Sequence, residues 1–117
     1  MTDALSTFFS AWSEGDATAR ADLIAQAMAE GFTYSDPRSG ARLMSLETLS
    51  DYVGQFSANA PGWTATVETT DEVNGYLRAR VAFGGKGPDG TDMVQHGTYF
   101  GEQNNDGKLV LLAGFVG

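Results

Sequence analysis

The chain has 117 residues, enough for one domain that buries a core without disulfides or a structural metal. It has no cysteine and one histidine, which excludes disulfide frameworks, thiolate metal sites, a cysteine nucleophile and any site that needs two imidazoles. Fifteen acidic against seven basic residues give a net charge of −8, which opposes binding to nucleic acid because its phosphates are also negative.

Targeting and membrane signals are also missing from the sequence. The N-terminus lacks a basic region followed by an apolar run, and no stretch of about eighteen apolar residues occurs. No Asp and Glu spacing resembles a calcium loop, so we expect no metal site. We therefore expect one domain over residues 1–117, cytoplasmic and without a membrane partner, with a processed secreted form as the alternative.

Apolar residues recur at helical spacing in two segments at the start of the chain. Gly15 and Asp16 separate these segments, and Gly31 closes the second, whose apolar face ends at Met28. Two helices are predicted, and the apolar face of the first consists of Leu5, Phe8, Phe9 and Trp12.

A short aromatic strand over residues 32–35 comes next, and Asp36 stands at its end, just before Pro37. A carboxylate where a sheet face meets a loop can project into a cavity, which makes Asp36 the leading candidate for a general base. The alternative is a turn in which this carboxylate accepts backbone N–H groups. Tyr34 shares the strand face and would line the cavity beside Asp36.

A third helix is indicated by Ser45 as its N-cap and Glu47 in its first turn. Met44 is placed to pack against Leu49 as a hydrophobic staple. The apolar face of this helix would consist of Leu46, Leu49, Tyr52, Val53 and Phe56.

From Trp63 onward the apolar period changes from helical to alternating, which predicts four strands. The first two are joined by a tight turn at Asn74-Gly75, and the others run roughly over residues 91–103 and 108–116. The last strand is apolar on both faces, so it is either central in the sheet or covered by a partner subunit. The element order predicts an α+β domain with three N-terminal helices packed on a strongly curved antiparallel sheet.

Along this order of elements the sequence contains WSEGD at 12–16, FTYSDP at 32–37, Gly40, GTY at 97–99 and DGKL at 106–109. The order and these motifs together resemble the nuclear transport factor 2-like superfamily. The closest similarity is to its SnoaL-like and ketosteroid-isomerase-like branch. The resemblance covers nearly the whole chain. It implies a cone-shaped fold with an internal apolar pocket, and a homodimer formed through the outer face of the sheet.

Asp36 matches the aspartate that acts as general base in ketosteroid isomerases, where it moves a proton between carbons. Phe8 stands where the resemblance places an oxyanion-holding tyrosine, and Phe8 has no proton to donate. Losing one such donor costs about two to three orders of magnitude in rate, which weighs against true steroid isomerase activity. Tyr99, at or near the position of the second oxyanion group, is the candidate substitute donor.

In the SnoaL-like cyclases a histidine and an acid in the pocket assist proton transfer, and His96 is the candidate for that part here. His96 and Tyr99 have opposite parity on one strand, so only one of their side chains can point inward unless a bulge intervenes. Both therefore stay catalytic candidates beside Asp36.

We expect a pocket for a small, mostly apolar molecule that carries a carbonyl or a hydroxyl. The reaction would be a cofactor-independent isomerisation or cyclisation, because the carbonyl of the substrate accepts the electrons. A non-catalytic ligand-binding or dimerisation module is the alternative, and an epoxide hydrolase ranks last because its Asp-Arg-Asp set has no convincing match. The residues expected to line the pocket are Trp12, Phe8, Tyr34, Tyr52, Phe56 and Trp63.

Overall fold

The computed structural model describes residues 3–117 and begins with α1 (Ala4–Ser10), which continues as a 3-10 turn, η1 (Ala11–Ser13). The Asp3 and Asp16 side chains cap α1 and α2 (Ala17–Ala27), each by accepting a backbone N–H at 2.8 Å. Ser45 caps α3 (Leu46–Asn59) in the same way, which confirms the predicted start of that helix.

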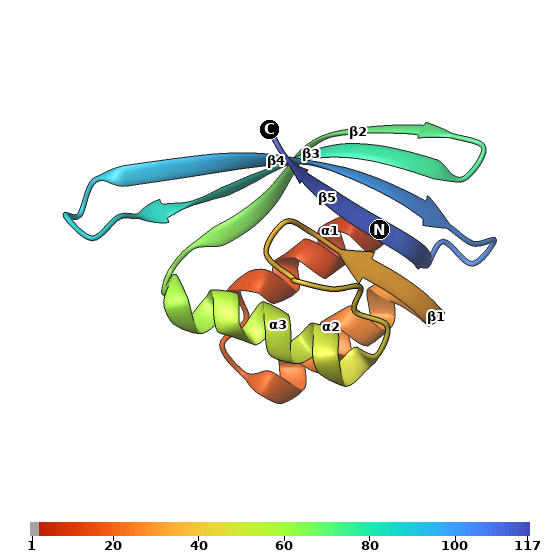
Figure 1. Ribbon diagram of the computed structural model, residues 1–117, viewed down its shortest axis with the longest axis horizontal. Coiled ribbons are helices and arrows are strands. Elements are labelled where there is room, and N and C mark those ends of the chain that lie inside the picture. The colour runs from red at the N-terminus through yellow and green to blue at the C-terminus, as the bar shows by residue number, and fades with distance from the viewer. Residues whose placement is uncertain (1–2) are drawn as a thin grey trace.

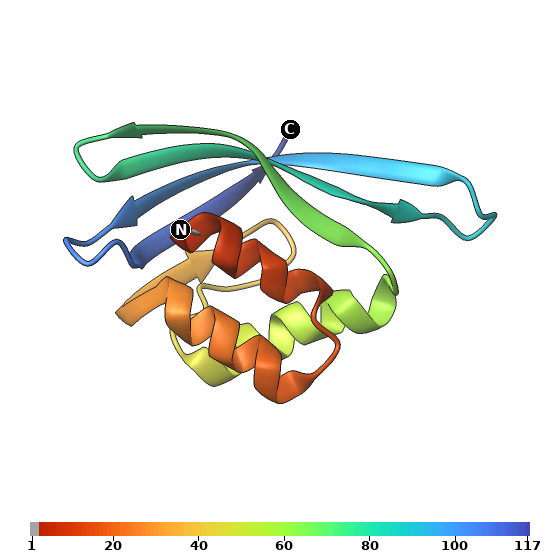
Figure 2. The ribbon, with the colours of Figure 1, turned by 180° about the vertical axis from the view of Figure 1, so that it is seen from behind.

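Five strands form one sheet in the order β1-β5-β4-β3-β2. Their bounds are β1 (Met28–Ser35), β2 (Thr64–Val73), β3 (Tyr76–Lys86), β4 (Asp92–Gln103) and β5 (Leu109–Val116). The sheet curves over the three helices, which cover only its inner face (Figures 1 and 2). The predicted α+β fold, three helices on a curved sheet, is confirmed.

The sheet is mixed, whereas the sequence predicted an antiparallel one. β1 runs parallel to β5, and the other three pairs are antiparallel. Alternation of apolar residues reports which face is buried but carries no information on strand direction. The long connection from β1 through α3 and three strands to β5 permits the parallel pairing, which no tight turn can make.

The second helix also ends earlier than predicted, because Met28 already has extended backbone and opens β1. Gly31 lies inside this strand with a φ of +79°, where the pairing with β5 changes register. A glycine with positive φ serves a helix C-terminus and a β-bulge equally well, so its presence did not distinguish the two.

The hairpin at Asn74-Gly75 is confirmed, with φ of 51° and 88° at its two central residues.

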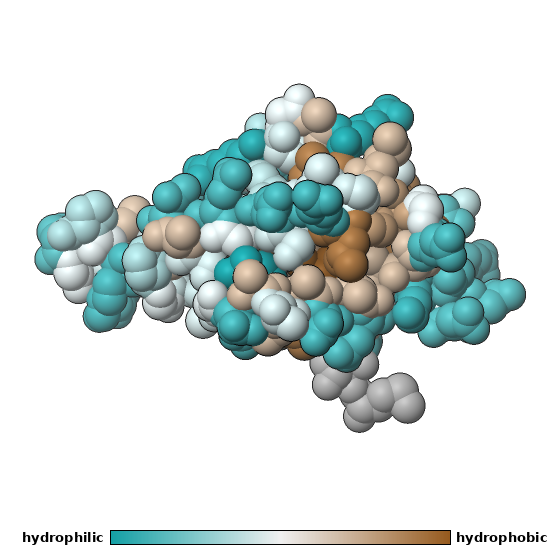
Figure 3. Space-filling model, turned by 90° about the horizontal axis from the view of Figure 1, so that it is seen from below, coloured by the Kyte–Doolittle hydropathy of each residue, from teal (hydrophilic) through white to brown (hydrophobic). Residues whose placement is uncertain are grey.

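The core fills the space between the helices and the inner face of the sheet, and its fully buried members include Ile24, Val53 and Leu112. Hydrophilic side chains cover much of the side seen from below (Figure 3). No helix within residues 3–117 is long and apolar enough to cross a membrane, and the expected cytoplasmic location stays a prediction.

Candidate functional site

Asp36 is fixed where β1 ends and the chain turns back on itself. Tyr34 and Leu43 exchange two backbone hydrogen bonds, at 2.9 and 2.7 Å, and so close the loop between them. Inside the loop the Asp36 backbone N–H donates to the Ser39 hydroxyl oxygen at 3.1 Å, and the Ser39 backbone N–H donates to the Asp36 carbonyl at 3.3 Å. The backbone that carries the carboxylate is therefore held on both sides.

The Asp36 carboxylate accepts hydrogen bonds from two phenols and one backbone group. Tyr52, on α3, lies 2.6 Å from Oδ1 and 2.8 Å from Oδ2, and Tyr34 donates to Oδ2 at 2.6 Å. The backbone N–H of Arg38 donates to Oδ1 at 2.9 Å. Asp36 thus forms the turn contact and also lines a cavity, and its role as a general base stays a prediction.

Tyr99, on β4, joins the same cluster through Tyr34, whose hydroxyl oxygen lies 3.5 Å from its own. Burial, and then the charge of Tyr99 and Asp36 nearby, raises the pKa of Tyr34 well above its ordinary value. Burial also raises the pKa of Tyr52 and of Tyr99 above the ordinary value for a phenol. All three phenols therefore keep their protons at neutral pH and act as hydrogen-bond donors.

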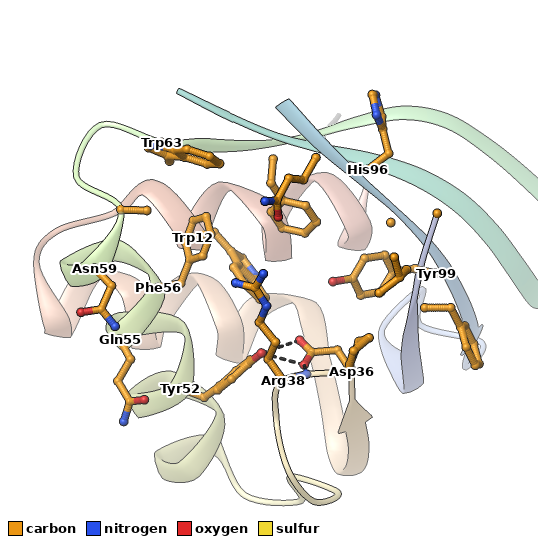
Figure 4. A pocket seen from close by; sticks show the side chains of 18 residues that line it. Trp12, Asp36, Arg38, Tyr52, Gln55, Phe56, Asn59, Trp63, His96 and Tyr99 are labelled. Atoms are coloured by element: carbon orange, nitrogen blue, oxygen red, sulfur yellow. Dashed lines mark hydrogen bonds between the residues drawn. The ribbon is translucent and has the colours of Figure 1, made fainter. Parts of the chain in front are cut away.

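A cavity of about 800 Å³ opens in front of this cluster, between α3, the end of β1 and the inner face of the sheet (Figure 4). Its walls are mainly aromatic, with polar groups at Asp36, Arg38, Gln55, Asn59 and Gln95. Within residues 3–117, no three acidic or histidine side chains converge where they could hold a metal ion. The cavity is lined by Trp12, Asp36, Pro37, Arg38, Tyr52, Gln55, Phe56, Asn59, Ala60, Trp63, Phe83, Gln95, His96, Gly97, Tyr99, Phe115, Val116 and Gly117.

Four of the six residues expected to line a pocket do so: Trp12, Tyr52, Phe56 and Trp63. The other two, Phe8 and Tyr34, are fully buried behind the cavity wall, with ring centroids 5.4 Å apart. Tyr34 still takes part in the site through its hydroxyl, whereas Phe8 only packs beneath it. The buried indole N–H of Trp12 has no hydrogen-bond partner among the described residues.

His96 and Tyr99 lie on opposite faces of β4, as strand parity requires. Tyr99 is 4% exposed on the inner face, and its hydroxyl points toward the Asp36 side of the cavity (Figure 4). His96 borders the cavity, but its side chain points away from Asp36, and its Nε2 lies 3.2 Å from Glu68 Oε1. Of the two, only Tyr99 is joined to the Asp36 cluster.

The sequence analysis did not single out four polar side chains that line the cavity beside the predicted candidates, namely Arg38, Gln55, Asn59 and Gln95. Gln55 and Asn59 follow Tyr52 and Phe56 at a spacing of three on α3, so helical periodicity places them beside the predicted apolar face. Phe83 has the parity of the buried residues of β3 and lines the cavity from that face. Arg38 lies in the loop after Asp36, and no periodic pattern in the sequence indicates that it lines the cavity.

Together, the fold and the site define a small α+β protein with an aromatic cavity. At one end of the cavity lies the Asp36 carboxylate, which accepts hydrogen bonds from the phenols of Tyr34 and Tyr52. The profile of the SnoaL-like domain family matches residues 5–112. The chain therefore belongs to the SnoaL-like domain family.

Solved structures agree with this membership. A candidate isomerase of the SnoaL-like family from Agrobacterium tumefaciens has a TM-score of 0.80 at 25% identity, over 97% of this chain and 94% of that one. A Catenulispora acidiphila protein with a ketosteroid isomerase-like fold, in complex with trimethylamine, has a TM-score of 0.77 at 14% identity. The match covers 97% of this chain and 85% of that one. A candidate SnoaL-like polyketide cyclase from a Jannaschia species has a TM-score of 0.71 at 14% identity, and the match covers 96% of this chain and 83% of that one. No curated protein matches the sequence.

Proposed function

We propose that this protein binds a small, mostly apolar molecule with a carbonyl group and catalyses a cofactor-independent proton transfer on it. The observation that carries the proposal is the position of Asp36 at the wall of an aromatic cavity, joined through Tyr34 to the Tyr99 hydroxyl. The candidate isomerase from Agrobacterium supports the reaction type, and the trimethylamine complex supports a small ligand in this fold.

In the proposed reaction, an Asp36 oxygen takes a proton from the carbon next to the carbonyl. The electrons of the broken C–H bond form a carbon–carbon double bond, and the carbonyl oxygen becomes an enolate that accepts a hydrogen bond from Tyr99. In an isomerisation, Asp36 then returns the proton to another carbon. In a cyclisation, the enolate carbon instead attacks a second carbonyl, whose oxygen becomes an alkoxide and takes the proton back from Asp36.

The Asp36 carboxylate can still accept this proton although several hydrogen-bond donors surround it. Tyr52 has one hydroxyl proton and lies near both carboxylate oxygens, so it donates fully to only one of them at a time. The other oxygen then has a lone pair for the substrate.

The second candidate is a non-catalytic ligand-binding module, and two observations favour it. Both Asp36 oxygens already accept hydrogen bonds from the protein, and Phe8 offers no hydroxyl below the cavity. A carboxylate held in this way also suits an orienting role toward a bound molecule.

The exchange of α-protons of β-tetralone, a flat apolar ketone, in deuterium oxide separates the two candidates by NMR. We expect the protein to accelerate the exchange, and Asp36→Asn to lower the acceleration by about two to four orders of magnitude with an unchanged circular dichroism spectrum. Asp51→Asn, an exposed carboxylate next to Tyr52 in sequence, is the matched control and leaves the rate unchanged. Binding without exchange, or full exchange in Asp36→Asn, contradicts the proposal.

We also propose a homodimer formed through the outer face of the sheet, which the helices of the chain leave uncovered. Tyr76 and Phe100 are 47% and 43% exposed there, and their rings stack with centroids 5.9 Å apart. Phe100→Glu would place a charge in this face and shift sedimentation from dimer to monomer. A monomeric wild-type protein at micromolar concentration contradicts the dimer.

A further inference from the structure

Arg38 follows Asp36 by two residues in the sequence, and both residues line the cavity. Its backbone is fixed by the N–H that donates to Asp36 Oδ1, inside the loop that Tyr34 and Leu43 close. Its side chain lines the cavity and extends from this turn toward the aromatic wall (Figure 4). The turn that positions the carboxylate thus also positions a guanidinium.

The Arg38 guanidinium has neither a salt bridge nor a hydrogen bond to the protein within residues 3–117, although acids outnumber bases two to one in the chain. Arg78, Arg80 and Lys86 each lie near an acidic side chain. Among the described residues 3–117, no other Arg or Lys lines the cavity. One unpaired cation therefore faces the ligand space.

No ion pair joins Asp36 to Arg38 among the described residues, and the oxygens of Asp36 accept hydrogen bonds from phenols and a backbone N–H instead. The guanidinium still acts on the cluster. Burial is the largest effect on Tyr52 and raises the pKa of its phenol, while the positive charge of Arg38 partly offsets that rise. The cavity therefore contains one negative and one positive group that remain unpaired with each other.

We propose that Arg38 binds an anionic group of the ligand, so that the substrate is a flat apolar carbonyl compound that also carries a carboxylate or a similar planar anion. This inference rests on the proposed function and names its substrate class. The planar guanidinium can donate two parallel hydrogen bonds to a carboxylate. With its anion at Arg38, the substrate keeps that charge away from Asp36 and presents its C–H to the base, and the cavity has room for both ends.

Both tryptophans of the chain, Trp12 and Trp63, line the cavity, so their fluorescence reports occupancy directly. The probes are three naphthalenes of one shape: naphthoate (anionic), naphthamide (neutral) and naphthylmethylammonium (cationic). We expect naphthoate to bind about tenfold more tightly than naphthamide, as a charge-assisted hydrogen bond allows. Arg38→Gln should abolish this preference, while Arg38→Lys keeps part of it.

Arg42→Gln is the matched control, since Arg42 is exposed in the same loop but does not line the cavity. It should keep the full preference for naphthoate. Equal affinities of naphthoate and naphthamide, or a preference that survives Arg38→Gln, overturn the role of Arg38 and leave the proposed function standing. Tightest binding of naphthylmethylammonium overturns it as well. If no probe binds, both this inference and the ligand-binding part of the proposed function fail.

Discussion

The two faces of β4 differ in what surrounds their polar side chains. On the inner face, Tyr99 is buried among aromatic rings, and its hydroxyl lies beside that of Tyr34. On the outer face, His96 lies near Glu68, which is also 3.7 Å from Arg80, in a setting that solvent reaches. Residues three positions apart on one strand therefore occupy a low-dielectric cavity wall and a partly hydrated sheet surface.

This difference shows where the fold can support proton transfer. On the inner face, burial keeps phenols protonated and strengthens each hydrogen bond, because water does not compete. On the outer face, charges are screened, and exposed ion pairs contribute little. The comparison predicts that changes at Tyr99 affect activity and that changes at His96 do not.

Of the changes that test this difference between the faces, Tyr99→Phe should have the largest effect, because it removes the proposed donor to the enolate. We expect the exchange of β-tetralone protons to slow by about two to three orders of magnitude, with the fold retained. Tyr76→Phe, which changes an exposed tyrosine on the outer face, is the matched control and should leave the rate unchanged. Equal rates in the two variants would contradict the distinction between the faces.

Gly114→Ala tests how the inner face makes room for Tyr99. A Cβ at Gly114 would lie 2.5 Å from Cε2 and 2.7 Å from Cζ of the Tyr99 ring, so the ring must move. We expect a loss of about 1–3 kcal/mol in the free energy of unfolding, measured with urea, and slower exchange. Gly15→Ala, where no atom lies within 4 Å of the added Cβ, is the control. A loss no larger than that of the control would mean that Tyr99 is not tightly placed.

The buried phenols also predict how stability responds to alkali. Burial raises the pKa of Tyr34 above its unfolded value of 10.0, so its stabilising contribution is complete below that pH and is lost as the pH rises further. Tyr34→Phe removes one such group, and its unfolding free energy should fall less steeply above about pH 10, by ~1.4 kcal/mol per pH unit. Denaturant titrations of both proteins measure the slopes, and parallel slopes contradict the prediction.

His96→Gln should have the smallest effect. Its contact with Glu68 is a partly exposed pair, so we expect a change within about 0.5 kcal/mol in stability and no change in the rate of proton exchange. Thermal unfolding and the β-tetralone assay measure the two quantities. A rate about tenfold lower would place His96 in the mechanism after all.

Local sequence signals predicted the elements and part of the cavity wall. Ser45 as N-cap, the Asn74-Gly75 turn and the order of helices and strands follow from capping, turn chemistry and periodicity, which act over a few residues. Arg38 and the hydrogen bonds of Tyr52 had no such signal. Tyr52 reaches Asp36 across sixteen residues, and this contact depends on how α3 packs against the end of β1.

The sequence by itself determined the fold class, the aromatic character of the pocket and the placement of Asp36 at a strand end, because each depends on near neighbours in the chain. Only the tertiary structure decided that β1 runs parallel to β5, that Tyr99 and not His96 joins the Asp36 cluster, and that Arg38 faces the cavity unpaired. These outcomes depend on contacts between residues far apart in sequence. Periodicity cannot specify strand direction, the inward face of a strand or the partner of a charge, since all three are settled when the helices close over the sheet.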